Sequence, residues 1–308
     1  MRSRAVFFLL ALSFSFLVPV RALADEAEAH FRMAQVHRQA GRQAEAAAEL
    51  RRAIELRPGY AAAHYALGSV LRQEGRNEEA LAEFTRSAEL EPTHASSHAM
   101  RGAMLLRLRR YDEAVAALRR ALELEPRDAT SWSNLGLAQR RLGHAAEARH
   151  AYEEGLRHAA NDPDLLNNLG VLDRDEHRYD EAIAHFRAAI AARGDQAPYH
   201  QNLGVVLRTL HRYDEAIVEY QAALALTPDE PGALYDLAAC YEQTNRRDQA
   251  IETYERYARA VEARDPAAAQ RARDTARNLS APAQPAQPAQ PPSPPPSSGT
   301  SSMRTRTR

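Results

Sequence analysis

The sequence predicts an all-α fold built from about seven stacked repeats of 34 residues. Two series of small residues support this prediction, because each recurs at a spacing of 34 without insertion. The glycines of the first series are Gly68, Gly102, Gly136, Gly170 and Gly204. The alanines of the second are Ala46, Ala80, Ala114, Ala148, Ala182, Ala216 and Ala250. A fixed period of this length indicates supersecondary units stacked on one another, which favours binding functions over catalysis.

All the repeats share one register when their positions are numbered from 1 to 34. They begin at Ala27, Ala61, Ala95, Ala129, Pro163, Ala197 and Pro231, and the last ends near Arg264. Position 8 is Gly in five repeats and Ala in two, position 20 is always Ala, and position 24 is always large and apolar. This pattern resembles the tetratricopeptide repeat, a helix-turn-helix unit of the same length.

The resemblance covers residues 27–264 and implies a right-handed superhelical solenoid whose first helices line a concave groove. The chain departs from the family pattern at position 4, where only Trp132 keeps the aromatic residue. It departs again at Ala160 and Gly194, which replace the closing proline. Because one repeat cannot bury its apolar face alone, the stack is the folding unit. We therefore expect one solenoid over residues 25–264.

Spacing within each repeat supports the helical interpretation independently. Positions 4, 7, 8 and 11 fall on one face of the first helix. A glycine inside a helix costs about 0.5–1 kcal/mol relative to alanine, so the glycines at position 8 need a compensating close contact. We expect the small residues at positions 8, 20 and 27 to face the large ones at positions 7 and 24. Asp128, and Asp162 followed by Pro163, are typical helix starts.

Residues 1–24 are interpreted as a secretory signal peptide. Two arginines precede a short apolar run over residues 5–18, and Ala22-Leu23-Ala24 forms a small-x-small cleavage site before Asp25. An uncleaved signal anchor is the alternative, and no other stretch of the sequence predicts a membrane span. All 40 basic residues are Arg, which favours a bacterial source. The expected location is therefore periplasmic or secreted.

Two segments follow the seventh repeat. Residues 265–279 predict a helix that caps the last exposed apolar face of the stack. Residues 280–308 are rich in Pro and Ser and predict a disordered tail. This tail is either a spacer or an arm that contacts a partner with its basic tip. A formal net charge of −1 gives no electrostatic case for binding nucleic acid.

The sequence lacks the familiar motifs of catalysis and of cofactor binding. It has no nucleotide-binding loop, zinc-protease helix or nucleophile elbow, so we expect neither enzymatic activity nor a cofactor. Cys240 is the only cysteine and is predicted to be a packing residue, with pairing between chains as the alternative.

Histidines and a cluster of acidic residues are the remaining candidates for chemistry. The histidines of position 4 are His30, His64, His98 and His200. They should lie about 8–10 Å apart in adjacent helices, too far to share a metal ion, so packed histidines without metal are expected. The cluster Asp173, Asp175, Glu176 and His177 is interpreted as a solvated turn rather than an acid/base pair.

The face opposite the packed stripe carries Asn134, Asn168 and Asn202 at position 6 of repeats four to six. Each Asn can offer a donor and an acceptor to an extended peptide backbone. The groove is similar to that of O-linked N-acetylglucosamine transferases, where Asn ladders bind peptide backbone, and this resemblance implies the same role here. A purely structural role for these residues is the alternative.

Arginines at positions 12 and 13 predict a basic rim beside the Asn residues. Position 12 is Arg38, Arg72, Arg140, Arg174 and Arg208, and position 13 adds Arg107 and Arg141. Guanidinium groups bind carboxylates bidentately, although the clamp spacing of chaperone adaptors is not reproduced, and a solvated face is the alternative. The candidate partner-binding residues are Asn134, Asn168, Asn202, Arg140, Arg141, Arg174 and Arg208.

The sequence thus predicts a non-catalytic protein–protein interaction scaffold. Its partner is a protein or peptide, with an acidic one favoured, bound in the concave groove of repeats four to six. One alternative is an accessory or substrate-recruiting subunit for a separate enzyme such as a glycosyltransferase. Another is a periplasmic metal or stress sensor, which would retain metal on purification. No nucleic-acid partner is expected, nor a membrane span once the signal peptide is cleaved.

Overall fold

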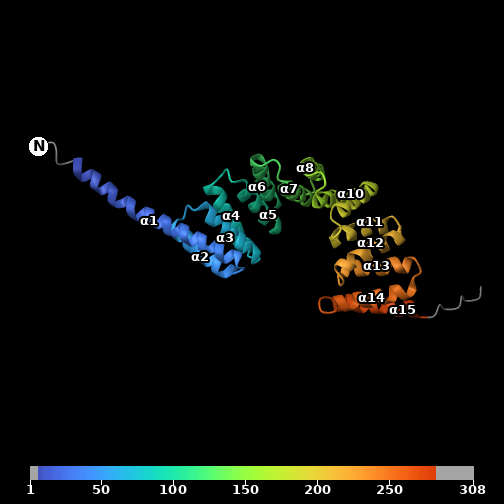
Figure 1. The fold of residues 1–308 in the computed structure, drawn as a ribbon. Coiled ribbons are helices and arrows are strands. Elements are labelled where there is room, and N and C mark those ends of the chain that lie inside the picture. Colours follow the sequence, from blue (N-terminus) through green and yellow to red (C-terminus); the bar gives the residue numbers. More distant parts are fainter. Residues whose placement is uncertain (1–5, 282–308) are drawn as a thin grey trace, which may run out of the picture.

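The computed structural model describes residues 6–281, with side chains from residue 23 onward. This part of the chain is helical and contains no strand. The helices follow one another along an elongated stack in chain order (Figure 1). They are α1 Val6–Gln39, α2 Gln43–Leu56, α3 Ala61–Gln73, α4 Asn77–Leu90, α5 Ala95–Arg107, α6 Tyr111–Leu124, α7 Ala129–Arg141, α8 Ala145–His158, α9 Pro163–Asp175, α10 Tyr179–Ala192, α11 Ala197–Thr209, α12 Tyr213–Leu226, α13 Pro231–Gln243, α14 Arg247–Val261 and α15 Pro266–Ser280.

Each repeat is a pair of helices, and the predicted all-α solenoid is confirmed. From the second repeat on, the first helix begins at the residue where the sequence register starts that repeat. The predicted helix starts are also observed. The side chain of Asp128 accepts a hydrogen bond from the backbone N–H of Thr130, and that of Asp162 accepts one from Leu165 N–H. These caps satisfy backbone donors that a helix leaves without an internal partner.

The glycines at position 8 lie against the large residue at position 24 of the same repeat. A methyl group placed on Gly102 would come within 2.5 Å of Leu118 Cγ, and one on Gly170 within 2.8 Å of Phe186 Cε1. Such distances leave no room for a side chain, so the two helices of a repeat approach closely because position 8 has none. This contact confirms the predicted pairing of the small residue at position 8 with the large residue at position 24.

The turn between the two helices has a left-handed residue at position 15 of every repeat. The φ angles are positive at Gly41, Gly75, Arg109, Gly143, His177, His211 and Asn245. Only three of these seven residues are glycines, which adopt this conformation at little cost. The fold therefore imposes the turn on Arg109, His177, His211 and Asn245.

The two ends of the stack differ. At the C-terminal end α15 covers α14, with Ala269 and Ala272 buried against Tyr254 and Ala258. The predicted tail begins at Ser280, which still belongs to α15, and from residue 282 onward it lies outside the described residues. At the N-terminal end α1 is continuous through residues 24 and 25, and Ala27 is the first fully buried residue among the side chains described from residue 23 onward. No helix within residues 6–281 is long and apolar enough to cross a membrane.

The first helices lie on the inner side of the solenoid. Contacts between alternate elements link α5, α7, α9, α11 and α13 to one another. Side-chain hydrogen bonds also join α7 to α9 and α9 to α11. We call the surface formed by positions 2, 5, 6, 9, 12 and 13 of these helices the inner face.

Candidate functional site

An open cleft of about 560 Å³ lies on the inner face of repeats two to four. Helices α3, α5 and α7 provide most of its walls. The apolar part of the lining consists of Met100, Ala103, Met104, Leu106 and Leu137. Most of these side chains are only half-buried, so the cleft offers apolar surface to a ligand. We call this hollow the inner cleft.

Four arginines surround the apolar lining of the inner cleft: Arg72, Arg107, Arg109 and Arg141. No carboxylate lines the cleft, and none of the described residues places a carboxylate within 4.0 Å of these four side chains. Arg107 has one long contact, from Nη1 to Asn77 Oδ1 at 3.4 Å, and the buried Nε of Arg72 has no partner. Four uncompensated cations around an apolar surface favour an acidic ligand.

A smaller hollow of about 190 Å³ adjoins the inner cleft near the N-terminal ends of α5 and α7. The two hollows share Met100 and Asn134. The smaller one carries Glu125 and Asp128 and lacks arginine. The surface therefore changes from basic near the C-terminal ends of α5 and α7 to acidic near their N-terminal ends, and a ligand that extends over both hollows would meet both charges.

The three predicted Asn residues differ in their environment. Asn134 lines both hollows and makes no side-chain hydrogen bond with the described residues. Asn168 Nδ2 donates to Ser133 Oγ at 3.0 Å, and Asn202 Nδ2 donates to Asn167 Oδ1 at 2.9 Å. The latter two contacts tie neighbouring repeats together, so only Asn134 has its full hydrogen-bonding capacity available to a ligand.

Three of the four arginines named as partner-binding candidates are paired inside the protein. Arg140 and Arg174 both contact Asp175, with N–O distances of 2.9 Å in each case. Arg208 lies 3.5 Å from Asp236. Burial raises the pKa of Asp236, and Arg208 partly offsets this effect. Of these four candidate arginines Arg141 alone lines the inner cleft, where it is joined by Arg72 and Arg107 of the predicted basic rim.

The candidate residues from the sequence register lie on the same face as the inner cleft, but most of them lie farther along the stack. The residues that the register missed in the inner cleft are Arg109 and the apolar lining, above all Met100, Leu106 and Leu137. The sequence contains a signal for them, at the positions where one repeat departs from the residue that recurs in the others. Met100 replaces Asn at position 6, and Leu106 replaces Arg at position 12.

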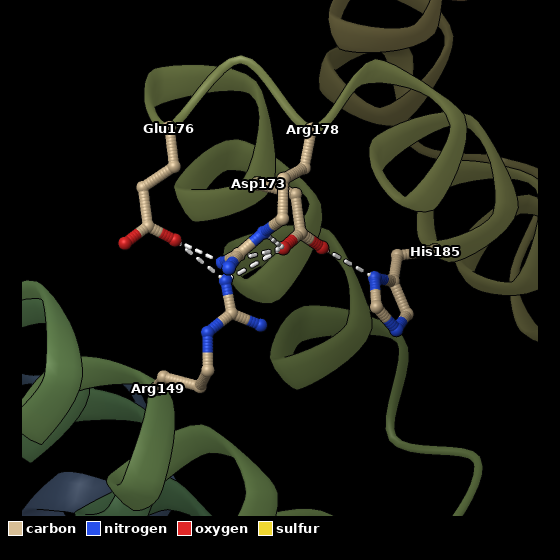
Figure 2. A network of polar contacts seen from close by, with 5 residues as sticks. All are labelled: Arg149, Asp173, Glu176, Arg178 and His185. Atoms are coloured by element: carbon tan, nitrogen blue, oxygen red, sulfur yellow. Dashed lines mark hydrogen bonds and ion pairs between the residues drawn. The ribbon is translucent and has the colours of Figure 1, made fainter.

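A buried charge network joins repeats four and five (Figure 2). Asp173 is fully buried. Its carboxylate accepts hydrogen bonds from Arg149 Nη2 at 2.6 Å, Arg178 Nε at 3.2 Å and His185 Nδ1 at 2.7 Å. Glu176 contacts both arginines at the rim. The interpretation of this segment as a solvated turn is therefore wrong for Asp173, whose charge is compensated by groups from two repeats.

The histidines at position 4 make a recurring internal contact. In three repeats a Glu at position 23 faces Nδ1 of the imidazole, at 2.5, 2.6 and 2.7 Å. These pairs are His30–Glu49, His64–Glu83 and His200–Glu219. Among the described residues no group of three His, Cys, Asp or Glu is placed to hold a metal ion.

In several repeats position 4 also contacts the turn that precedes its helix. Trp132 Nε1 donates to the carbonyl oxygen of Pro126 at 2.8 Å, and Nε2 of His64 and His98 contact the corresponding oxygens of Pro58 and Pro92 at 3.1 Å. Histidine therefore replaces the usual aromatic residue in a structural role.

Similar solved structures share the fold. A tetratricopeptide repeat protein from Parabacteroides merdae has a TM-score of 0.65 and 13% identity, covering 82% of this chain and 100% of its own. A chain of the APC/C hetero-tetramer Cut9–Hcn1 has a TM-score of 0.63 and 22% identity over 72% of this chain. The match covers only 44% of that longer chain. The pilF protein of Pseudomonas aeruginosa has a TM-score of 0.58 and 23% identity, covering 69% of this chain and 96% of its own.

Two family models match the sequence, whereas no curated protein matches it. Residues 207–273 match a model described as tetratricopeptide repeat. Residues 17–233, more than half of the chain, match a model described as the cilia and flagella-associated protein 70 C-terminal domain. The chain therefore belongs to the tetratricopeptide repeat proteins, in the family described by the C-terminal domain of cilia and flagella-associated protein 70.

Proposed function

We propose that the protein is a non-catalytic scaffold that binds a segment of a protein partner in the inner cleft. The single observation that supports this function is the combination of half-buried apolar side chains with four arginines that lack a carboxylate partner. Apolar surface and uncompensated charge both gain from a ligand that covers them. Repeat solenoids present extended surfaces of this kind to their partners.

The favoured ligand is a segment with one large apolar side chain between acidic residues. The apolar side chain would cover Met100, Leu106 and Leu137. Its flanking carboxylates would reach Arg107 and Arg141. Asn134, which has no internal partner, would bond to the backbone of the segment.

Short fluorescent peptides test this function directly. Each peptide holds one Leu or Phe between Glu, Gln or Lys residues, and fluorescence anisotropy measures its affinity. We expect the Glu peptides to bind most tightly. Replacing Arg107 and Arg141 together by Glu should weaken binding about a hundredfold, because two charge-assisted contacts become repulsive. Added salt should weaken the wild-type interaction.

A matched control is Arg157→Glu on α8, where the side chain is 68% exposed and outside the inner cleft. This variant carries the same type of charge change and should bind like the wild type. Asn134→Ala should weaken binding without loss of stability. If no peptide binds, or if the Arg107/Arg141 variant binds as tightly as the Arg157 variant, the proposed function is wrong.

We also propose that the protein is exported, with cleavage before Asp25. In support, the first packed residue is Ala27, so loss of residues 1–24 would leave the helix pair α1–α2 intact. N-terminal sequencing of the protein recovered from an expressing bacterium tests this proposal. Asp25 is the expected first residue, and an intact Met1 would overturn it.

A further inference from the structure

The first helix of the stack exposes a surface that is buried in the later repeats, apart from the half-buried Arg101 of repeat three. Positions 3, 7 and 10 lie between a repeat and the one before it, as with Ala63, Leu67 and Val70, which are at most 3% exposed. Their equivalents on α1 are exposed, with Met33 at 52% and Val36 at 57%. No other described element covers this surface. We call Ala29, Met33 and Val36, together with Ala40 in the turn that follows, the outer face of α1.

The opposite end of the stack has no comparable surface. There α15 supplies four buried alanines that close the last repeat. Within residues 6–281 the solenoid is therefore capped at one end and open at the other. The open end has the spacing that accepts a further helix, because the same positions accept one in six successive repeats.

Charges along the open end are separated. Asp25 and Glu26 lie near the start of the described side chains of α1, and Arg42 lies in the turn after its end. The equivalent Arg246 of the last repeat contacts Asp214 of the preceding repeat at 2.5 Å, so this position faces the neighbouring repeat. Arg42 has no described carboxylate within 4.0 Å, and Glu26 reaches only His30, at 4.0 Å. The open end thus has an acidic side and a basic side, each free to pair with a group outside the repeat.

We propose that the outer face of α1 binds the same face of a second copy, with the two helices antiparallel. In this arrangement Met33 packs against Val36 of the partner subunit, and Glu26 approaches Arg42 of the partner subunit. A parallel pair would instead place like charges together. An antiparallel pair is isologous, so the contact closes as a twofold dimer and leaves no open end.

The area of the contact between the two α1 helices determines the expected affinity of the dimer. One helix pair buries less than the roughly 800 Å² per partner of a standard interface. The dimer should therefore be reversible, with a dissociation constant of the order of micromolar. The inner cleft is on a different face, so this proposal does not depend on the proposed ligand.

Sedimentation velocity over a range of concentrations tests the dimer, with protein recovered after export. The wild type should shift from monomer to dimer as its concentration rises. Replacing Met33 and Val36 by Asp should raise the dissociation constant about a hundredfold or more, because charged groups would be buried without partners. Both residues are exposed, so circular dichroism should show an unchanged fold. The control Val218→Asp, at a side chain 60% exposed on α12, should dimerise normally.

A charge exchange tests the antiparallel arrangement. The Glu26→Arg and Arg42→Glu variants should each dimerise more weakly than the wild type, because each places like charges together. An equimolar mixture should form mixed dimers, and salt should weaken them. A wild type that stays monomeric, or a dimer unaffected by the Met33/Val36 change, would overturn the proposal. Failure of the mixture to form dimers would contradict the antiparallel pairing.

Discussion

Gly136 lies directly beneath the ring of Tyr152, so that a methyl group on Gly136 would come within 2.3 Å of Tyr152 Cε1. This contact holds the two helices of repeat four together, and its equivalents recur in four other repeats. Tyr152 is fully buried and surrounded by packed side chains. The ring therefore has little room to move away from an added atom.

Gly136→Ala should destabilise the protein by about 1–3 kcal/mol, the usual cost of overpacking a core. This loss should exceed the intrinsic gain in helix propensity from replacing Gly by Ala. The matched control is Gly59→Ala, where an added methyl group would meet nothing within 4 Å. Urea unfolding of both variants measures the difference. Equal midpoints for the two would contradict the close contact.

The buried carboxylate of Asp173 predicts a strong effect for a small change. Asp173→Asn leaves Arg149, Arg178 and His185 without the charge that compensates them, and should cost about 3–5 kcal/mol. Asp175→Asn is the control, because its side chain is 39% exposed and surface pairs contribute at most about 1 kcal/mol. Urea unfolding compares the two. A loss for Asp173→Asn no larger than that for Asp175→Asn would be inconsistent with Figure 2.

Cys240 should be unreactive in the folded protein. It is fully buried on α13, and burial raises the pKa of its thiol to about 11. Because the thiolate is the reactive form, both access and ionisation are suppressed near neutral pH. A maleimide reagent should label Cys240 in urea but not under native conditions. Rapid native labelling, or a disulfide-linked dimer on a non-reducing gel, would contradict this expectation.

The sequence predicts the helix pairs well because each repeat restates the same local pattern. The starts of α3, α5, α7, α9, α11 and α13 fall at the predicted residues. The turn at position 15 was not predicted, because Arg109 and His177 adopt positive φ although their side chains disfavour it. Here the packing of the two helices overrides the preference of a single residue.

The position of the candidate site was harder to predict, for a physical reason. Arg140 and Arg141 are neighbours in the sequence, at positions 12 and 13 of repeat four, but Arg140 contacts Asp175 in the next repeat whereas Arg141 lines the inner cleft. Which arginine is compensated depends on partners 35 residues away. A residue type that recurs at one position of successive repeats indicates on which face of the solenoid it lies. Only the pairing between repeats shows which charges remain available to a ligand.

The His–Glu pairs suggest a substitution that should change how the stability of the protein depends on pH. His98 occupies the same position as His64, but Ala117 stands where the pairing Glu would be. Burial lowers the pKa of His98. Its folded pKa is therefore below the unfolded value of about 6.5. The unfolded state then takes up the proton first, and His98 removes stability as the pH falls through the unfolded pKa.

Ala117→Glu should place a carboxylate opposite the ring, as Glu83 lies 2.6 Å from His64. The carboxylate stabilises the imidazolium, so the pKa of His98 should rise. Once the folded pKa exceeds the unfolded one, the linkage changes sign and acidification stabilises the variant. NMR titration of His98 and urea unfolding between about pH 7 and pH 5 measure both effects. The control is Ala151→Glu, opposite Trp132, whose indole cannot take up the proton. This control should not become more stable as the pH falls. A similar gain in stability in both variants would mean that the pairing with His98 is not its cause.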